Sequence, residues 1–135
     1  MKIFTIVIII FLAISCTSHD TMFNEIQKEI IINDNSYNVV IATDQDCITC
    51  LFSLQKTLNV NENTQGIYFS KHPKQLIIRL HKIFPNIKWK LSNNTKLLKL
   101  IKKESEEGPY LINIQNKKAT YISAQNYNKF KLTQI

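Results

Sequence analysis

Two cysteines separated by two residues lie where the chain changes from a strand-like to a helix-like pattern, and this feature limits the possible fold more than any other. Residues 37–43, YNVVIAT, form a continuous β-branched run that is typical of a buried central strand. After Asp46 the apolar positions recur every three or four residues, which predicts a helix. Cys47 and Cys50 are therefore expected in its first turn. The expected inner face of this helix consists of Cys47, Cys50, Leu51, Leu54 and Leu58.

Strand and helix patterns alternate along the rest of the chain, and turn-forming residues separate them. Proline is tolerated in the first turn of a helix, so Pro73 marks a helix start, and Pro85 ends the same helix. Asn94 or Thr95 is the expected cap of the next helix. The predicted strands are 25–32, 37–43, 66–70, 87–91, 109–114 and 118–123, and the predicted helices begin near residues 47, 72, 95 and 125.

This order of elements resembles the thioredoxin fold, with a strand, a CxxC at a helix start, a strand, helices and a proline that opens a β-hairpin. In that family the proline is cis and lies beside the CxxC, where it lines the substrate groove, and the matching residue here is Pro109. Residues 73–84 and the segments IKWKLSNNT, LLKLIKK and GPYLINIQNKK look especially like the peroxiredoxin-related, membrane-tethered thiol-disulfide oxidoreductases of the TlpA type. The resemblance covers roughly residues 37–123. It implies a three-layer α/β/α sandwich with a central mixed β-sheet.

Two positions depart from the pattern of that family. Asp46 stands where the family usually has Trp before the first cysteine, and Gly108 stands where Thr or Val usually precedes the cis-proline. The topology does not depend on these side chains, so the expected fold is unchanged. The efficiency and direction of the redox chemistry do depend on them.

The helix start assigns different roles to the two thiols. Unpaired amides and a partial positive charge at a helix N-terminus favour a sulfur anion, so Cys47 is the expected nucleophile. Cys50, one turn deeper, is the expected resolving thiol, less exposed than Cys47, that releases the partner from a mixed disulfide. Asp44 and Asp46 place negative charge nearby, which raises the pKa of Cys47 and favours a reducing protein.

A CxxC pair can also bind a metal, act as a peroxidase site or form a purely structural disulfide. A structural zinc site needs four ligands, but no second cysteine pair exists, and His72 and His81 are nine residues apart, so no metal or other cofactor is expected. The context of Cys47 does not match that of a peroxidatic cysteine. A purely structural disulfide stays open as an alternative, although a loop this short constrains the unfolded chain only slightly.

The first sixteen residues predict export and lipid attachment. Lys2 precedes an apolar run from Ile3 to Ile14, which is shorter than the about 20 residues of a membrane-spanning helix and fits a secretory signal. The residues Ala13-Ile14-Ser15-Cys16 resemble the bacterial lipoprotein box, which implies that Cys16 becomes the lipidated first residue. The expected organisation is a signal peptide at 1–15, a lipidated tether at 16–22 and a thioredoxin-like domain at 23–135. Thr17 resembles the outer-membrane sorting preference of some bacteria, so a periplasm-facing outer-membrane location is favoured over the cytoplasmic membrane.

Charge is unevenly distributed along the chain, whose net charge is +7. The segment from Lys71 to Lys103 contains ten basic residues and no acidic one. Most of these side chains are expected simply to be solvated, with attraction to anionic headgroups or to an acidic redox partner as the alternatives. Nucleic acid is an unsuitable partner for an exported lipoprotein.

The sequence supports two hypotheses of function. The first is a monomeric, membrane-anchored thiol-disulfide oxidoreductase that reduces disulfides of exported proteins and is itself reduced by an upstream membrane electron donor. The second is a non-catalytic thioredoxin-like lipoprotein that binds a partner and keeps a structural disulfide.

Overall fold

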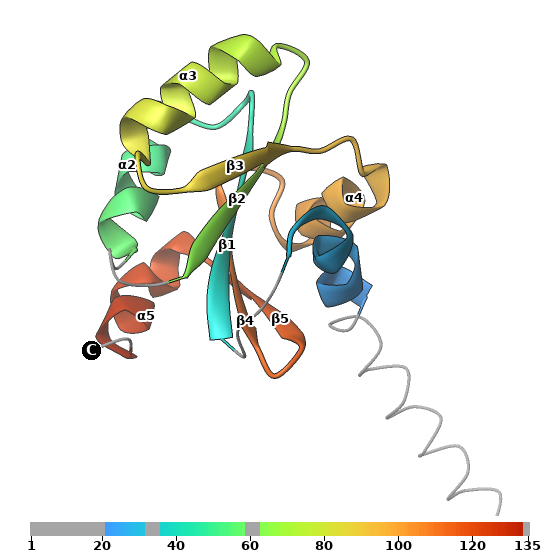
Figure 1. Ribbon diagram of the computed structural model, residues 1–135. Coiled ribbons are helices and arrows are strands. Elements are labelled where there is room, and N and C mark those ends of the chain that lie inside the picture. The colour runs from blue at the N-terminus through green and yellow to red at the C-terminus, as the bar shows by residue number, and fades with distance from the viewer. Residues whose placement is uncertain (1–20, 32–35, 59–62, 134–135) are drawn as a thin grey trace, which may run out of the picture.

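The computed structural model describes residues 21–31, 36–58 and 63–133 (Figure 1). Strands and helices alternate up to a C-terminal hairpin and helix. The strands are β1 (Ser36–Thr43), β2 (Thr64–Phe69), β3 (Lys88–Leu91), β4 (Tyr110–Gln115) and β5 (Lys118–Ile122). The helices are residues 21–29, α2 (Ile48–Thr57), α3 (Pro73–Ile83), α4 (Thr95–Glu104) and α5 (Tyr127–Thr133), the last preceded by a 3-10 turn at Ala124–Asn126.

The described strands form one five-stranded mixed sheet in the order β3-β2-β1-β4-β5. β1 runs parallel to β2 and antiparallel to β4, and Ile41 is the partner of Ile67 on one side and of Tyr110 on the other. β3 runs parallel to β2, and β5 runs antiparallel to β4. The strand that leads to the cysteines is therefore the central one, as the β-branched run predicted.

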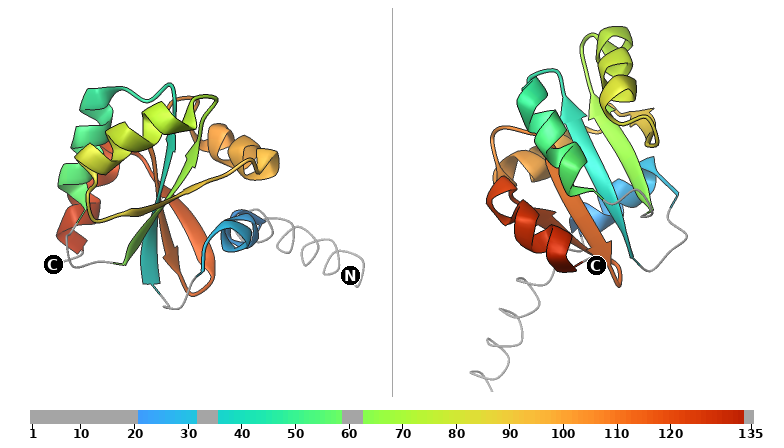
Figure 2. Two further views of the ribbon diagram at one scale, coloured as in Figure 1. Left: turned by 45° about the horizontal axis from the view of Figure 1, so that its top comes forward. Right: turned by 90° about the vertical axis from the view of Figure 1, so that its left-hand side faces the viewer.

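Each face of the sheet is covered by helices (Figure 2). Along β1, Val39 and Ile41 point into one core, and Val40 and Ala42 point into the other. The helix at 21–29 and α4 close the first core, while α2, α3 and α5 close the second. This arrangement confirms the predicted thioredoxin-like three-layer α/β/α sandwich. The disulfide helix α2 and α4 lie on opposite faces of the sheet.

The predicted strand at 25–32 is wrong, because residues 21–29 are helical. The buried residues Met22, Ile26 and Ile30 follow one another at intervals of four, which places them on one side of a helix. The β-branched run that ends this segment suggested a strand, but burial of this apolar stripe against the sheet decides the conformation. The helix also includes residues 21 and 22, which the sequence had assigned to the tether.

Most helix and turn signals are confirmed. Pro73 begins α3, and the side chain of Asn94 caps α4 by accepting a hydrogen bond from the Leu97 amide at 3.1 Å. The β4–β5 hairpin turns through Asn116 and Lys117, whose φ angles are 51° and 62°. Two consecutive left-handed residues match the right-handed twist of the flanking strands.

Candidate active site

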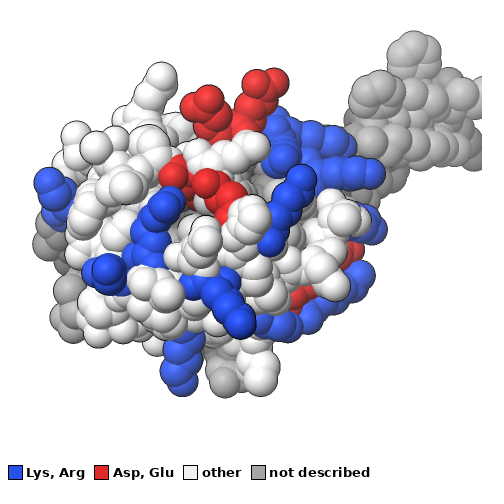
Figure 3. All heavy atoms as spheres, turned by 90° about the horizontal axis from the view of Figure 1, so that it is seen from above, with Lys and Arg blue, Asp and Glu red and all other residues white. Residues whose placement is uncertain are grey.

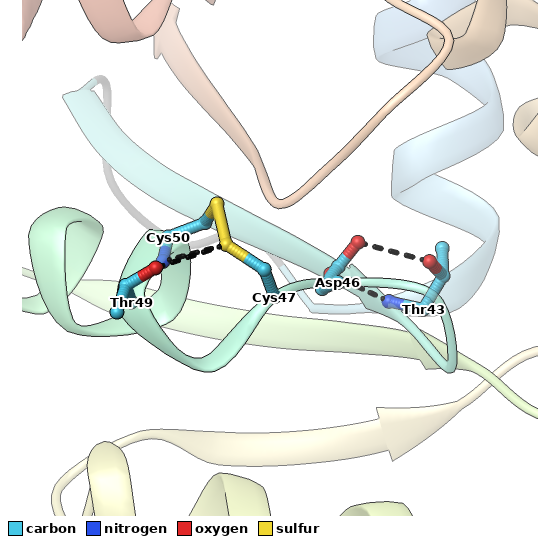
Figure 4. Close-up of a disulfide and its surroundings, with 5 residues drawn as sticks. All are labelled: Thr43, Asp46, Cys47, Thr49 and Cys50. Atoms are coloured by element: carbon cyan, nitrogen blue, oxygen red, sulfur yellow. Dashed lines mark hydrogen bonds between the residues drawn. A yellow bond between two sulfur atoms is a disulfide. The ribbon is translucent and has the colours of Figure 1, made fainter.

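A disulfide joins Cys47 and Cys50 at the start of α2 (Figure 4). Their Cα atoms are 5.1 Å apart, within the range that a disulfide spans. Cys47 is the N-cap residue, and its sulfur accepts a hydrogen bond from the Cys50 amide at 3.0 Å. The sulfur of Cys47 therefore lies at the amide-rich end of the helix. After reduction, the same amide and the helix dipole would stabilise a thiolate there.

Thr49 supplies a second polar contact that sequence reasoning missed. Its hydroxyl oxygen lies 3.3 Å from the sulfur of Cys47 (Figure 4). A hydroxyl can donate to a thiolate, so this group adds to the stabilisation that the Cys50 amide provides. The signal was present in the sequence, since a hydroxyl residue between the two cysteines of a first helical turn falls within reach of the capping sulfur.

Both cysteines are exposed. The expectation that Cys50 is the less exposed of the two stays a prediction. The predicted inner face is confirmed at Leu51 and Leu54, which are fully buried. The disulfide is therefore exposed at the N-terminal end of the helix that these leucines attach to the sheet, where another molecule can reach it.

Two apolar side chains of α2 are also exposed. Ile48 and Phe52 have 52% and 47% of their surface accessible, and they lie four residues apart on α2. Residues with this spacing are neighbours on one side of a helix. Sequence reasoning followed only the buried stripe of α2 and missed this pair, which forms a small exposed apolar surface on the disulfide helix.

The loop that precedes β4 lies against the residue before the disulfide. The peptide bond between Gly108 and Pro109 is cis, as the resemblance implied, and Pro109 is buried. A Cβ atom added to Gly108 would lie 2.5 Å from the Oδ1 atom of Asp46 and 2.8 Å from the Cε2 atom of Tyr110. The structure therefore brings Gly108 and Asp46, the two departures from the family pattern, into direct contact with each other.

Asp46 is a buried carboxyl group with 5% of its surface accessible. The amide of Thr43 donates to Oδ2 at 2.8 Å, and the Thr43 hydroxyl donates to Oδ1 at 3.0 Å (Figure 4). Burial raises the pKa of Asp46 to about 6, even though both hydrogen bonds from Thr43 act to lower it and the charge of Asp44 adds to the rise. This carboxyl group changes charge in mildly acidic solution, directly beside Cys47.

Asp44 has the opposite behaviour although it lies only two residues away. Partial burial would raise its pKa, but the Ser70 hydroxyl and the Lys71 amide donate hydrogen bonds to the carboxylate and lower the pKa below its ordinary value of 3.8. The positive charge of His72 acts in the same direction. Asp44 therefore stays ionised and ties the β1–α2 loop to the start of α3. The predicted effect of the two carboxylates on the pKa of Cys47 stays a prediction.

Tyr110 completes the underside of the Gly108 loop and was not among the predicted site residues. Its hydroxyl donates to the backbone oxygen of Ser105 at 2.8 Å, which holds the end of α4 against the start of β4. Burial, with a smaller contribution from the charge of Asp46, raises the pKa of Tyr110 to about 12. Tyr110 is therefore neutral at physiological pH.

The remaining predictions concern the lipid anchor, membrane-spanning helices and metal sites. Cys16, the predicted lipidation site, and the signal and tether residues 1–20 are outside the described ranges. None of the helices in the described ranges has the length and apolar character needed to span a bilayer. Within the same ranges, His, Cys, Asp and Glu side chains nowhere gather in threes with a geometry suited to a metal ion.

The sheet order, the exposed CxxC disulfide after the central strand and the cis-proline that opens β4 define a thioredoxin-like domain with a disulfide at the N-terminus of its second helix. No protein-family model matches the chain, and searches of curated proteins and of solved structures find no significant match either.

Proposed function

We propose that this protein is a membrane-anchored, extracytoplasmic thiol-disulfide oxidoreductase that reduces disulfides of exported proteins. The observation that carries the proposal is an exposed Cys47–Cys50 disulfide at a helix N-terminus, with Gly108 of the cis-proline loop packed against the residue that precedes it. A sulfur in this position can form a thiolate, and the neighbouring loop offers an edge along which an extended substrate can lie.

The exchange starts from the dithiol form. The Cys47 thiolate attacks one sulfur of a substrate disulfide, a bond forms between the two sulfurs, and the other substrate sulfur leaves as a thiolate and takes up a proton. Cys50 loses its proton and attacks the sulfur of Cys47, which breaks the mixed disulfide and releases the second substrate thiol. Two electrons and two protons have then passed to the substrate. A membrane-bound dithiol donor restores the dithiol form of the pair by the reverse exchange.

Substrate binding is assigned to two surfaces next to the sulfurs. The backbone at Gly108 and Pro109 pairs with an extended segment of the substrate through hydrogen bonds of the β type. Ile48 and Phe52 contact apolar side chains beside the substrate cysteine. Such side chains are available in exported proteins that are incompletely folded, which is when their disulfides need correction.

Anchoring in the bacterial envelope is the part of the proposal that depends on the sequence alone. The apolar run from Ile3 to Ile14 and the lipoprotein-like box ending at Cys16 support it. Two or more acyl chains on one residue give stable attachment, whereas one chain gives only marginal binding. The periplasmic side of the outer membrane is the proposed location.

A non-catalytic binding module with a structural disulfide is the second candidate. The disulfide observed between Cys47 and Cys50 fits this candidate as well as the first, and the replacement of Trp by Asp46 and of Thr or Val by Gly108 favours it. Its weakness is energetic, because a disulfide that closes so short a loop adds little stability to the fold.

Insulin reduction with an excess of dithiol separates the two candidates. The unmodified chain should accelerate precipitation of the insulin B chain, and Cys47→Ser and Cys50→Ser should both abolish turnover. When the reduced proteins are freed of dithiol and mixed with insulin, only Cys50→Ser should accumulate a mixed disulfide, because Cys47 still attacks but nothing resolves the product. Ser53→Ala, on the same helix but outside the motif, is the matched control and should keep full activity. An inactive unmodified chain with a normal circular dichroism spectrum would favour the binding module.

Mass spectrometry of the intact protein from bacterial membranes tests the anchoring. After thiol trapping, the expected mass corresponds to a chain that begins at Cys16 with its acyl groups attached and carries two trapped or two disulfide-bonded cysteines. A chain that keeps residues 1–15, or starts at a residue other than Cys16, contradicts the lipoprotein assignment. This result would not bear on the redox activity, which the insulin assay tests separately.

A further inference from the structure

The outer side of α4 concentrates positive charge. Its four lysines are all exposed and lie opposite the buried residues Leu97 and Ile101. These lysines are Lys96, Lys99, Lys102 and Lys103. Within the described part of the chain only Lys96 of the four forms an ion pair, and its partner is Glu25 at 3.4 Å. The other three lysines form no ion pair with a described acidic side chain.

The charged side of α4 continues onto the helix at 21–29. Glu25 is buried between the two helices, where it accepts a hydrogen bond from Asn94 at 2.9 Å and pairs with Lys28 at 3.0 Å. The hydrogen bond from Asn94, followed by that from Lys28, holds the pKa of Glu25 at about 2. Glu25 therefore joins the helix at 21–29 to α4 and is not part of the exposed surface. The exposed surface that remains, called the lysine face below, consists of Lys28, Lys96, Lys99, Lys102 and Lys103.

The lysine face lies where the described chain begins. Thr21 lines the same surface hollow as Lys28 and Lys96. At no more than about 3.5 Å per residue, the five steps from Cys16 to Thr21 extend by at most about 18 Å. A lipid on Cys16 therefore keeps the helix at 21–29 and the adjoining end of α4 close to the bilayer surface. Attraction to anionic headgroups acts over about one Debye length, roughly 8 Å at physiological salt.

From these observations we infer that the lysine face is a membrane-docking surface that binds the headgroups of anionic phospholipids. The inference rests on the lipid anchoring in the proposed function. Charge complementarity selects the occupant, because the lysine face adjoins the anchoring point and includes three lysines of α4 that form no ion pair with a described acidic side chain, so it meets the phosphates of the bilayer before any other polyanion. Figure 3 shows how widely Lys and Arg side chains are spread over the molecule when it is viewed from above.

Docking through the lysine face gives the redox site a fixed orientation. α4 and the helix at 21–29 cover one face of the sheet, and α2 with its disulfide covers the other (Figure 2). A bilayer bound to the first layer leaves Cys47 and Cys50 directed away from the membrane. A flexible tether alone would allow the disulfide to face the lipid for part of the time. The lysine face thus presents the sulfurs to substrates in the aqueous compartment.

The test compares lysine accessibility on two kinds of vesicle. The protein purified from membranes is reconstituted into vesicles of phosphatidylcholine alone or with added phosphatidylglycerol, and it is labelled with an amine reagent that does not cross bilayers. Peptide mass spectrometry then gives the labelling rate of each lysine. We expect labelling of all five lysines of the lysine face to fall at least about threefold on the anionic vesicles and to recover at high salt. Lys129 and Lys131 on α5 should not change.

A pair of charge variants makes the test specific. The triple variant K99Q/K102Q/K103Q should lose the protection of Lys28 and Lys96 on anionic vesicles. The matched triple variant K74Q/R79Q/K82Q removes the same charge from exposed positions of α3, on the other face of the sheet, and should keep that protection. All six positions are exposed, so neither variant disturbs the core.

Each other outcome contradicts the inference. Equal labelling on both kinds of vesicle shows that the lysine face does not bind anionic lipid. Protection that appears only in native envelope fragments and disappears after protease treatment assigns this surface to an acidic protein partner instead. Equal protection of the α5 lysines indicates adsorption without orientation. Failure of the lipid anchoring is read separately, from the intact mass of Cys16 in the same sample.

Discussion

Replacing Asp46 by Asn should change how the stability of this protein depends on pH. The pKa of Asp46 is about 6 in the folded protein, against 3.8 for an exposed carboxyl group. Each tenfold change in an acid dissociation constant is worth about 1.4 kcal/mol, so this difference corresponds to about 3 kcal/mol. Because the folded-state pKa is raised, the stabilising contribution is complete below pH 3.8 and is lost as the pH rises through about 6. Above that pH the protein keeps a buried carboxylate that opposes folding.

Asparagine has a similar shape but carries no charge at any pH. It can accept only one of the two hydrogen bonds that Thr43 donates, and the loss of the other should cost about 1 kcal/mol. Asp46→Asn should therefore be less stable than the unmodified protein by about 1 kcal/mol near pH 4. Near pH 8 it should be more stable by about 2 kcal/mol, since the charge penalty of about 3 kcal/mol outweighs the lost hydrogen bond. The two stability curves should cross between these values.

Urea denaturation of the oxidised proteins from pH 4 to pH 8, followed by the fluorescence of Trp89, measures this difference. Asp44→Asn is the matched control, and its effect should have the opposite sign. The pKa of Asp44 is lowered by Ser70 and Lys71, so its loss should destabilise the protein by a similar amount from pH 4 to pH 8, because this contribution is lost only below its ordinary pKa of 3.8. A difference between the Asp46→Asn and unmodified proteins that stays constant across this range would show that the Asp46 carboxyl group is not perturbed by burial.

Three further predictions concern other parts of the structure. Thr49→Val should raise the pKa of reduced Cys47 by removing a hydroxyl donor, which would slow alkylation by iodoacetamide at neutral pH by about threefold to tenfold, whereas Thr49→Ser should react normally. Gly66→Ala should lower the urea midpoint, with a loss of about 1 to 3 kcal/mol, because the added Cβ would overlap the ring of Trp89; an unchanged midpoint would contradict this close packing. Glu25→Gln should lower the melting temperature at neutral pH, and the effect should disappear as the pH falls from 4.5 to about 2, where Glu25 itself becomes protonated. Melting curves that differ equally at all pH values would refute the ionic role of Glu25.

The elements around the cysteines were predictable because their signals are local. A central strand has both of its faces buried, so it consists of a continuous β-branched run that can be recognised in the sequence. The predicted strand at 37–43 differs from β1 by a single residue. Pro73 and Asn94 act on the hydrogen bonds of the first helical turn, so they mark helix starts in any tertiary context. The position of the disulfide at the start of α2 follows from these same signals.

Features that depend on distant segments were not predictable. The helix at 21–29 is selected by its packing against the sheet and by the contact of Glu25 with Asn94, 69 residues further along the chain. Asp44 and Asp46 look equivalent in the sequence, yet one meets donors at Ser70 and Lys71 and the other is buried beneath Gly108. The environment of each carboxyl group is created by a segment that the local pattern does not contain.

The contact between Asp46 and Gly108 suggests that the two departures from the thioredoxin-like pattern compensate each other. A side chain at 108 would overlap the Asp46 carboxyl group, so a buried Asp at 46 is compatible only with glycine at 108. Gly108→Ala should therefore cost about 1 to 3 kcal/mol in the unmodified protein. In an Asp46→Ala background it should cost less, although the ring of Tyr110 still lies near the added atom.

A double-mutant cycle measures this dependence, because residues in direct contact show coupling energies of about 0.5 to 3 kcal/mol, whereas independent sites are additive within a few tenths. The stabilities of the unmodified protein, both single variants and the double variant are compared at one pH above the pKa of Asp46. Additive effects would mean that the glycine and the carboxyl group are tolerated independently. A coupling energy within the expected range would mean that the space beside Cys47 is shaped by both residues, so that the charge next to the disulfide and the form of the substrate edge cannot change separately.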